Sequence, residues 1–501
     1  MIQRILLCFL IICGCSKDSE MDIPSDSEID SPQNQNDAIY LSGITIKCYN
    51  WAIIGATGEV NGSTYTVVDE TQLRQMVDQG ADVTKVCTTK VTDMSELFQD
   101  TEFNQDISSW DVSNVSNMGS MFRWSEFNQD IGRWITSNVR SMNFMFAGSS
   151  FNQPIKSWNV MNVSDMSGMF GGSSFNQPIG NWNVSNVRNM YAMFSGTTFN
   201  QDISSWDVSN VTNMTVMFAR SPFNQNISSW DVSNVKDMIQ MFITSEFNQD
   251  IGSWDVSGVI NMGGMFTDSQ FNRDISSWNV GNVTSMDQMF SGSQFNQDIS
   301  SWDVSRVTSM GAMFMDSQFN QDISSWDVRR VTNMGAMFEN SVFNRDISSW
   351  NVNRVTEMGY MFYNSQFNQD ISAWDVQNVF YMSRMFALSP FNQDIGSWNV
   401  HNVTYMESMF FNSPFNQDIS AWDLSSAAYM GSMFQNSPFN QDISSWDVRN
   451  VAKMEYMFYN SEFNQDLSGW NVANVTDCSG FSGNAPQWVL PKPNFVSCDP
   501  N

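Results

Sequence analysis

From Phe103 to Phe463 the chain repeats one 24-residue pattern of apolar and polar positions sixteen times, without insertion or deletion. We number the phenylalanine that begins each repeat as position 0. Phe at position 0, Asn at position 1 and Trp at position 7 occur in all sixteen repeats, and position 4 is Ile except at Leu467. A period of this length indicates that each repeat is one structural unit, stacked on near-identical neighbours.

Two segments of each repeat have different periodicities. Positions 6–10, commonly Ser-Trp-Asp-Val-Ser, alternate polar and apolar residues, which predicts a short half-buried strand. Positions 12, 15, 18 and 19 commonly hold Val, Met, Met and Phe, which fall on one face of a helix of about two turns. The pattern therefore predicts an α/β repeat fold, a solenoid of short parallel strands and short helices with internal ladders of Trp, Phe, Ile and Met.

Both ends of the repeat array are predicted to be capped. Residues 38–87 lie outside the pattern and contain a predicted strand near 62–68 and a predicted helix at 69–78, so we expect an N-terminal cap. The solenoid is assigned to residues 88–477, with full repeats from 103, and residues 478–501 form a Pro-rich C-terminal cap. Caps are expected because an outermost unit would otherwise expose its core and its strand edge.

The N-terminus resembles an export signal. Arg4 precedes the apolar run Ile5–Ile12, which is too short to span a bilayer, and the run ends in a Cys-Gly-Cys sequence that resembles a bacterial lipoprotein cleavage box. We therefore expect residues 1–15 to be a lipoprotein signal peptide and Cys15 to carry the lipid. An ordinary signal peptide is the alternative.

Residues 16–37 are rich in Ser, Asp, Glu, Asn and Pro, with few apolar side chains, so they are predicted to be a disordered tether. The expected localisation is export, followed by lipid anchoring to the bacterial outer membrane or cell surface.

The composition narrows the class of partner. The formal net charge is −29, which repels nucleic acid and anionic membranes. We therefore expect an extracellular protein or glycan as partner, no nucleic acid, and membrane contact only through the N-terminal lipid.

Four cysteines flank the repeats in two local pairs, Cys48 with Cys87 and Cys478 with Cys498. In an exported protein this arrangement predicts two disulfides that close the caps. Metal binding is an alternative, but no histidine lies nearby in the sequence. Cys478 also occupies a core Met position, so simple burial is open as well.

The sequence predicts no enzyme and no catalytic residue. Asp stands at position 3 in thirteen repeats and at position 8 in nine, and such identical residues have like environments, whereas acid/base pairs need unlike ones. No metal site or cofactor is expected, with calcium along these Asp ladders as the one candidate, because stacked carboxylates repel each other.

Departures from the repeat are the best candidates for ligand binding. Arg306, Arg330 and Arg354 occupy position 11 of three consecutive repeats and are predicted to form a basic stack for a carboxylate or sulfated ligand. Local neutralisation by neighbouring aspartates is the alternative.

A second departure is a concentration of tyrosines. Tyr381, Tyr405 and Tyr429 stand at position 14 of successive repeats, opposite the buried stripe of the predicted helix, with Tyr360 and Tyr456 close in sequence. An exposed tyrosine row is typical of a binding interface. Neutral drift among duplicated repeats would also produce it.

The repeat Met-Phe-x-x-Ser-x-Phe-Asn-Gln-Asp-Ile-Ser-Ser-Trp-Asp-Val-Ser-Asn-Val-Thr-Asn resembles that of BspA-type leucine-rich-repeat surface proteins, a type also found in mycoplasma surface lipoproteins. The resemblance covers about residues 88–482 and departs from ordinary leucine-rich repeats by using Trp, Ile and Val for Leu. It implies a leucine-rich-repeat-like solenoid on a bacterial surface that mediates adhesion or binds a host matrix protein, a cell surface or a glycan. A structural or shielding surface protein without a specific ligand is the alternative.

Overall fold

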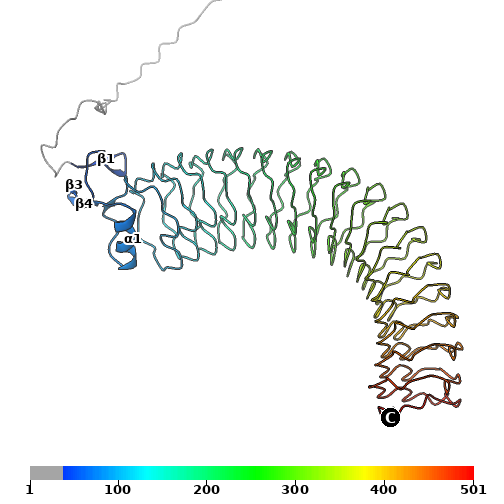
Figure 1. Ribbon diagram of the computed structural model, residues 1–501. Helices are drawn as coiled ribbons and strands as arrows, with labels where there is room; N and C mark the ends of the chain where they lie inside the picture. Colours follow the sequence, from blue (N-terminus) through cyan, green and yellow to red (C-terminus); the bar gives the residue numbers. More distant parts are fainter. Residues whose placement is uncertain (1–37, 501) are drawn as a thin grey trace, which may run out of the picture.

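The computed structural model describes residues 38–500, so the predicted signal peptide, Cys15 and the predicted tether lie outside the described residues. Figure 1 shows a small N-terminal cap followed by a curved stack of coils, one coil for each repeat. All helices and strands of the described residues belong to the cap. They are β1 (Ile39–Ser42), β2 (Thr45–Cys48), β3 (Thr57–Val60), β4 (Ser63–Val67), α1 (Glu70–Asp78) and β5 (Val86–Cys87).

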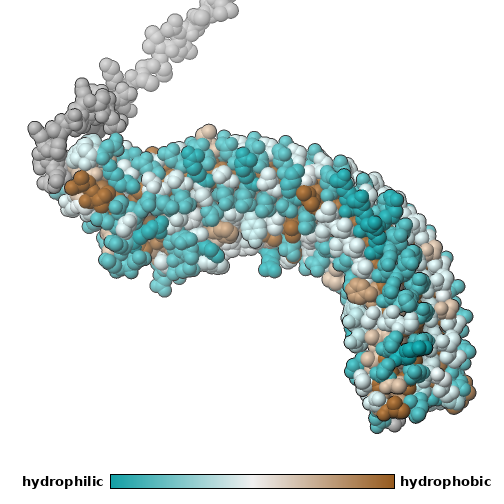
Figure 2. All heavy atoms as spheres, in the orientation of Figure 1, coloured by the Kyte–Doolittle hydropathy of each residue, from teal (hydrophilic) through white to brown (hydrophobic). Residues whose placement is uncertain are grey.

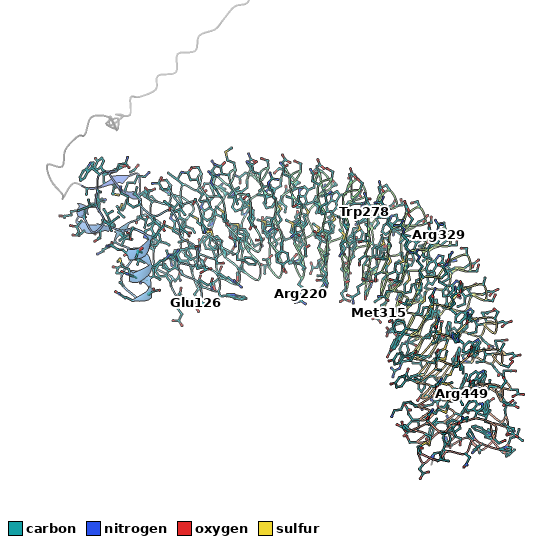
Figure 3. The ribbon with its side chains drawn as sticks, viewed as in Figure 1. Glu126, Arg220, Trp278, Met315, Arg329 and Arg449 are labelled. Carbon is teal, nitrogen blue, oxygen red and sulfur yellow. A yellow bond between two sulfur atoms is a disulfide. The ribbon has the colours of Figure 1, made fainter. Side chains whose placement is uncertain are left out.

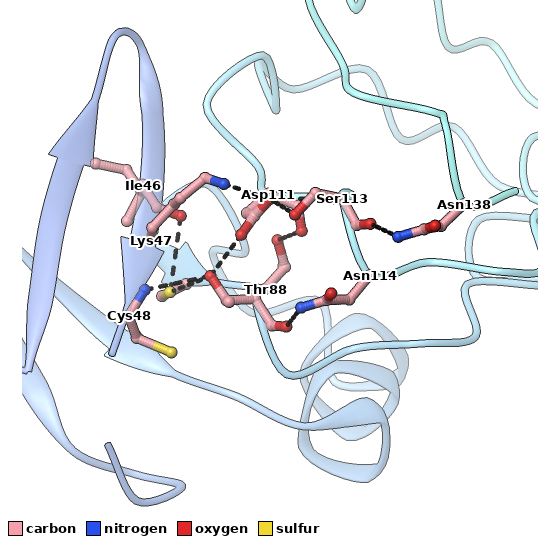
Figure 4. Close-up of polar contacts among 10 residues, drawn as sticks. Ile46, Lys47, Cys48, Thr88, Asp111, Ser113, Asn114 and Asn138 are labelled. Carbon is pink, nitrogen blue, oxygen red and sulfur yellow. Dashed lines mark hydrogen bonds and ion pairs between the residues drawn. The ribbon is translucent and has the colours of Figure 1, made fainter. Parts of the chain in front are cut away.

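The cap joins two small sheets to the first coil. β1 pairs antiparallel with β2, while β4 pairs antiparallel with β3 and parallel with β5. The helix α1 begins at its N-cap Asp69, whose carboxylate accepts the Gln72 N–H at 2.8 Å, within the helix predicted at residues 69–78. Asp111 of the first coil is buried against the cap, where its carboxylate accepts the Thr89 hydroxyl at 2.8 Å and lies 3.7 Å from Lys47 Nζ (Figure 4).

The helix predicted within each repeat is wrong. Positions 15–22 instead run through successive β-turns, as between Met286 and Met289, where the Met289 N–H donates to the Met286 carbonyl at 3.1 Å. The third residues of the turns that begin at positions 15 and 19 have a positive φ, 58° at Gln288 (position 17) and 64° at Gly292 (position 21). Because these turns follow one another every three to four residues, they bury Met, Met and Phe at the same spacing as a helix.

The predicted strand around Trp is also wrong. Neighbouring coils are bonded on another side, where the N–H groups of positions 15, 17, 19 and 21 donate to the carbonyls of positions 14, 16, 18 and 20 of the next coil. In one coil Met286 donates to Ser309 at 3.0 Å and Phe290 donates to Met313 at 3.0 Å. Parallel bridges at position 14 continue this ladder from Asp93 to Asp477.

The invariant residues build the interior. Phe290 is fully buried, and its ring lies 5.8 Å from those of Phe266 and Phe314 in the adjacent coils. From the second repeat on, each repeat tryptophan donates its indole N–H to an isoleucine carbonyl of the preceding coil, as Trp302 does to Ile275 at 3.1 Å, and Trp110 of the first repeat donates to the Val83 carbonyl of the cap. The position 1 asparagines accept, through their side-chain oxygens, the backbone N–H of the next such asparagine.

The backbone ladder also explains the curvature. Hydrogen-bonded strands lie about 4.8 Å apart, whereas the stacked rings of Trp278 and Trp302 are 6.4 Å apart. The stack therefore bends toward the ladder, which places positions 14–21 on the concave face and positions 7–11 on the convex face. In Figure 3, Arg220 (position 21) and Met315 (position 20) lie along the inner edge of the arc, and Arg329 (position 10) lies at its outer edge. On the convex side the coils are too far apart for a backbone ladder, so no strand forms there.

A glycine substitution distinguishes these turns from a helix. Val216 at position 17 has a φ of 50°, which costs a residue with a Cβ about 1–2 kcal/mol. Val216→Gly removes that cost but adds about 0.5–1 kcal/mol of chain entropy, so we expect a net stabilisation of about 0.5–1 kcal/mol in denaturant unfolding. Thr215→Gly, at the neighbouring position without a positive φ, is the control and is expected to destabilise. Destabilisation by both substitutions would favour a helix.

Candidate functional site

The tyrosine row lies on the concave face. Tyr381, Tyr405 and Tyr429 are half-buried, and their ring centroids lie 5.5 and 4.9 Å apart from one coil to the next. The prediction that they stand opposite the buried stripe of a helix is wrong, because position 14 begins the backbone ladder between coils. The row is nevertheless continuous over three coils.

A hollow lies beside this row, between the position 17 and position 20 side chains of four coils. Its volume is about 220 Å³. Its lining residues are Tyr363, Arg384, Ala387, Ser408, Phe411, Ser432 and Gln435. The small side chains Ser408, Ser432 and Ala387 form the low part, and larger aromatic residues stand around it.

Two tyrosine pairs stand in the coils at either end of this region. Tyr360 lies 5.7 Å from Tyr363, and Tyr456 lies 5.6 Å from Tyr459, measured between ring centroids. The guanidinium of Arg384 lies 5.4 Å from the Tyr360 ring centroid, which fixes both side chains by a cation–π contact. We call the seven tyrosines the tyrosine face: Tyr360, Tyr363, Tyr381, Tyr405, Tyr429, Tyr456 and Tyr459.

Sequence reasoning missed Arg384 and Phe411 as members of this surface. Arg384 stands in the position 17 column with Tyr360 and Tyr456, and Phe411 stands in the position 20 column with Tyr363 and Tyr459. The aromatic residues at position 20, Tyr363, Phe411 and Tyr459, were the available signal.

The tyrosine face replaces residues that stabilise the coil elsewhere. In many other coils the position 14 side chain caps a turn, as Asn333 does by accepting the Gly335 N–H at 2.9 Å. A tyrosine cannot make that contact. Tyr360 and Tyr456 also hold a positive φ, 59° and 54°, which is unfavourable for a bulky residue.

Burial on this face shifts the pKa values of two neighbouring groups, a phenol and a carboxyl. It raises the pKa of the Tyr381 phenol, and it raises the pKa of the Glu357 carboxyl in the preceding coil. The Tyr381 hydroxyl therefore stays protonated at neutral pH and can both donate and accept a hydrogen bond.

The three position 11 arginines share one groove on the convex side. Its volume is about 790 Å³. Its lining residues are Ser305, Arg306, Thr308, Asp327, Arg329, Arg330, Thr332, Asn351, Asn353 and Arg354. Arg329 pairs with Asp327 at 2.6 Å, and this hydrogen bond holds the pKa of the Asp327 carboxyl below its usual value. The three arginines thus lie together with Arg329 along one groove, and a ligand for them stays a prediction.

The described residues contain one disulfide, between Cys478 and Cys498. Cys48 and Cys87 are buried free thiols, which differs from the predicted pair. Cys87 Sγ lies 3.7 Å from the Ile46 carbonyl oxygen and 3.4 Å from the Thr89 hydroxyl, which also accepts the Cys48 N–H at 3.2 Å.

The same thiols affect each other's titration. A hydrogen bond from Cys87 lowers the pKa of Cys48 to about 7, while donating that bond and being buried raise the pKa of Cys87.

The carboxylate ladders bond to their own coils. At position 3, Asp322 accepts the Ser324 N–H at 2.9 Å, and this bond lowers the pKa of the Asp322 carboxyl. At position 8, the Ser209 hydroxyl lowers the pKa of Asp207 in the same way. Within residues 38–500, no three or more His, Cys, Asp or Glu side chains are grouped so that they could hold a metal ion. Calcium along the ladders stays a prediction.

His401 contacts Asp423 Oδ2 at 3.0 Å and Ser425 Oγ at 3.2 Å, but both contacts are to Nδ1. A catalytic relay needs the serine and the carboxylate on different ring nitrogens.

No helix among residues 38–500 has the length and apolar character needed to cross a bilayer.

The geometry defines the class of protein. Identical coils, bonded one to the next and carrying their variable side chains on two faces, make this a tandem-repeat protein with few helices and short strands. The chain belongs to the family described as "Mycoplasma protein of unknown function, DUF285", which matches it in nine overlapping segments. They are residues 70–177, 149–246, 171–270, 221–319, 242–342, 291–389, 316–414, 340–437 and 387–489. This membership is consistent with the mycoplasma part of the resemblance found in the repeat, and no curated protein matches the chain.

Proposed function

We propose that this protein is a bacterial cell-surface lipoprotein whose leucine-rich-repeat-like solenoid binds an extracellular protein or glycan, without catalysis. It would be exported and anchored through Cys15, and the concave tyrosine face would contact the partner. Family membership is consistent with a repeat surface protein. The BspA-type resemblance supports the solenoid class and an adhesive role.

One observation carries the proposal. Seven of the eleven tyrosines fall in five consecutive coils, on one face, and beside one hollow. Five of the seven stand where the repeat otherwise has a turn cap, or at a positive φ. Proteins often accept such local costs where a surface serves binding. Tyrosine is suited to this role because it offers a large, rigid surface with one polar end.

The test is an array of glycans and matrix proteins probed with the mature chain, followed by affinity measurement for each bound partner. The variant Tyr381→Asn/Tyr405→Asn/Tyr429→Asn restores the residue that caps the turn in other coils, so we expect it to fold at least as well. We expect it to bind the partner at least about tenfold more weakly, a loss of about 1.4 kcal/mol.

Tyr191→Ser, an exposed tyrosine in a distant coil, is the matched control and is expected to bind normally. Unchanged affinity in the triple variant would exclude the tyrosine face as the contact surface. If the mature chain binds nothing on the array, the shielding alternative is favoured, which the net charge of −29 also fits.

A further inference from the structure

The coils of the convex groove lack a side-chain hydrogen bond that joins neighbouring coils elsewhere in the chain. In most coils the position 11 asparagine donates its side-chain N–H to the position 10 carbonyl of the preceding coil. Figure 4 shows this contact from Asn138 to Ser113, at 2.7 Å. The same bond joins Asn282 to Ser257 at 2.8 Å and Asn378 to Asn353 at 2.6 Å, on either side of the groove.

The three arginines do not replace this bond. Arg306 donates instead to the Asn282 side chain at 2.6 Å. Elsewhere in the sixteen repeats the asparagine is absent only from single coils, at Gly258 and Ser426. Three consecutive coils thus forgo a hydrogen bond between coils that most other coils make. Loss of a stabilising contact in adjacent coils at one surface is typical of a functional site.

Positive charge in the groove is only partly neutralised. Arg329 is engaged by Asp327, the one carboxylate in the lining, and position 8 of the next coil is Asn351 rather than Asp. Arg330 and Arg354 are exposed and form neither a hydrogen bond nor an ion pair with any described residue. Asp303 and Asp327 also attract Arg306 and Arg330 through space, but neither forms an ion pair with them, so all three guanidinium groups keep N–H donors for an anion.

The rest of the lining identifies the class of ligand. Apart from the charged residues, it consists of Ser305, Thr308, Thr332, Asn351 and Asn353, whose hydroxyl and amide groups can bond to sugar hydroxyls. It has no aromatic side chain on which a nucleic acid base could stack, and no apolar pocket for the anchor residue of a peptide. On this side consecutive coils repeat at about the 6.5 Å spacing of the Trp326 and Trp350 rings, which suits a linear polymer with regularly spaced charges.

We propose that this groove binds a short segment of an anionic polysaccharide, with the three arginines paired to successive carboxylate or sulfate groups. Arginine forms two parallel hydrogen bonds to such a group, and the polar lining orients the sugar rings. The site lies on the opposite face from the tyrosine face, so it is a second binding activity and does not depend on the proposed function.

The experiment measures binding of heparin and hyaluronan oligosaccharides to the mature chain at about 50 and 200 mM salt. The two probes distinguish sulfate from carboxylate as the anionic group. Neutral dextran, polyglutamate and oligo(dT) serve as comparison ligands. We expect at least one anionic oligosaccharide to bind, more weakly at the higher salt, and to bind more tightly than the three comparison ligands.

The variant Arg306→Asn/Arg330→Asn/Arg354→Asn restores the common asparagine, so its thermal midpoint is expected to equal or exceed that of the native chain. Its affinity for the oligosaccharide is expected to fall by at least about tenfold, with a shallower salt dependence. The matched control Arg188→Thr/Arg273→Gln/Arg449→Ser removes the same charge elsewhere and also installs the common residue at each position, and we expect it to bind nearly as the native chain does.

The proposal would be overturned if neither anionic oligosaccharide bound, or if polyglutamate or oligo(dT) bound more tightly than the oligosaccharide. It would also be overturned if the Asn variant kept the affinity of the native chain, or if the matched control lost as much affinity as the Asn variant. The position 14 tyrosine variant keeps all three arginines and is expected to bind the oligosaccharide normally. That result separates this site from the tyrosine face.

Discussion

Phe290→Ala is expected to destabilise the middle of the stack by about 3–5 kcal/mol. The Phe290 side chain has no exposed surface, and its ring centroid lies 4.1 Å from that of Phe295 and 6.2 Å from that of Trp302. Alanine would leave a cavity that the flanking coils cannot fill, because their own phenylalanines are held by the backbone ladder. Since each coil contacts mainly its neighbours, the damage is expected to stay local. Hydrogen exchange should rise most in the coils on either side.

The matched control for this prediction is Phe380→Ala, which removes the same side chain from a position that is 40% exposed. It is expected to change stability by less than about 1 kcal/mol. Two results would contradict a stack held together by local contacts: an equal loss of stability from the two substitutions, or hydrogen exchange that rises evenly along the whole chain.

Loss of the Cys478–Cys498 disulfide is expected to destabilise the C-terminal cap by about 3 kcal/mol, from the chain entropy of a loop of this length. This cap covers the last coil. Trp488 packs 4.8 Å from the Phe463 ring and donates its indole N–H to the Gln465 carbonyl at 3.0 Å, and Asn464 accepts the Val489 N–H at 2.8 Å. Without the disulfide, the cap is expected to open before the coils do.

The measurement is hydrogen exchange of the mature chain with and without a reductant, beside the variant Cys478→Ala/Cys498→Ala. Exchange is expected to rise in residues 478–500 and to spread into the last coil. The N-terminal cap is the internal control, since Cys48 and Cys87 form no disulfide there. A reductant effect at the N-terminal cap, or none at the C-terminal cap, would contradict this account.

The interior of the stack could be predicted from the sequence because the positions that pack between coils hold the same residue in every repeat. Phe, Trp and Asn recur without exception at positions 0, 7 and 1, and all three serve the contact between coils. The backbone conformation could not be inferred from the same residues. A helix and a series of turns both bury Met286, Met289 and Phe290 at intervals of three and one, so the apolar pattern does not separate them.

Position 21 carried a signal that distinguishes the two. Gly, Asn or Asp stands there in most repeats, as at Gly292, Asp316 and Asn340, and all three of these residues have a positive φ. Such residues adopt that conformation more readily than others. Their recurrence every 24 residues indicates a turn at a position where a helix would disfavour them.

The candidate site was predictable only as a set of departures from the repeat. The arginines at position 11 meet in one groove because three consecutive coils place them in register. Arg384 and Phe411 were missed because they are not tyrosines, although positions 14, 17 and 20 would share one face in a helix as well. The disulfide predicted between Cys48 and Cys87 is wrong, because the two side chains are buried as free thiols.

The central claim is that the invariant positions build the stack and the departures from the repeat carry recognition. Its most direct test is one variant that returns the two rows of departures, at position 11 (Arg306, Arg330 and Arg354) and at position 14 (Tyr381, Tyr405 and Tyr429), to asparagine. The variant and the native chain are compared on the same array of glycans and matrix proteins, with the thermal midpoint measured in parallel. We predict that the variant loses the binding of the native chain while its midpoint stays equal or rises. Binding that persists in a folded variant would contradict the claim and assign recognition to the repeat itself.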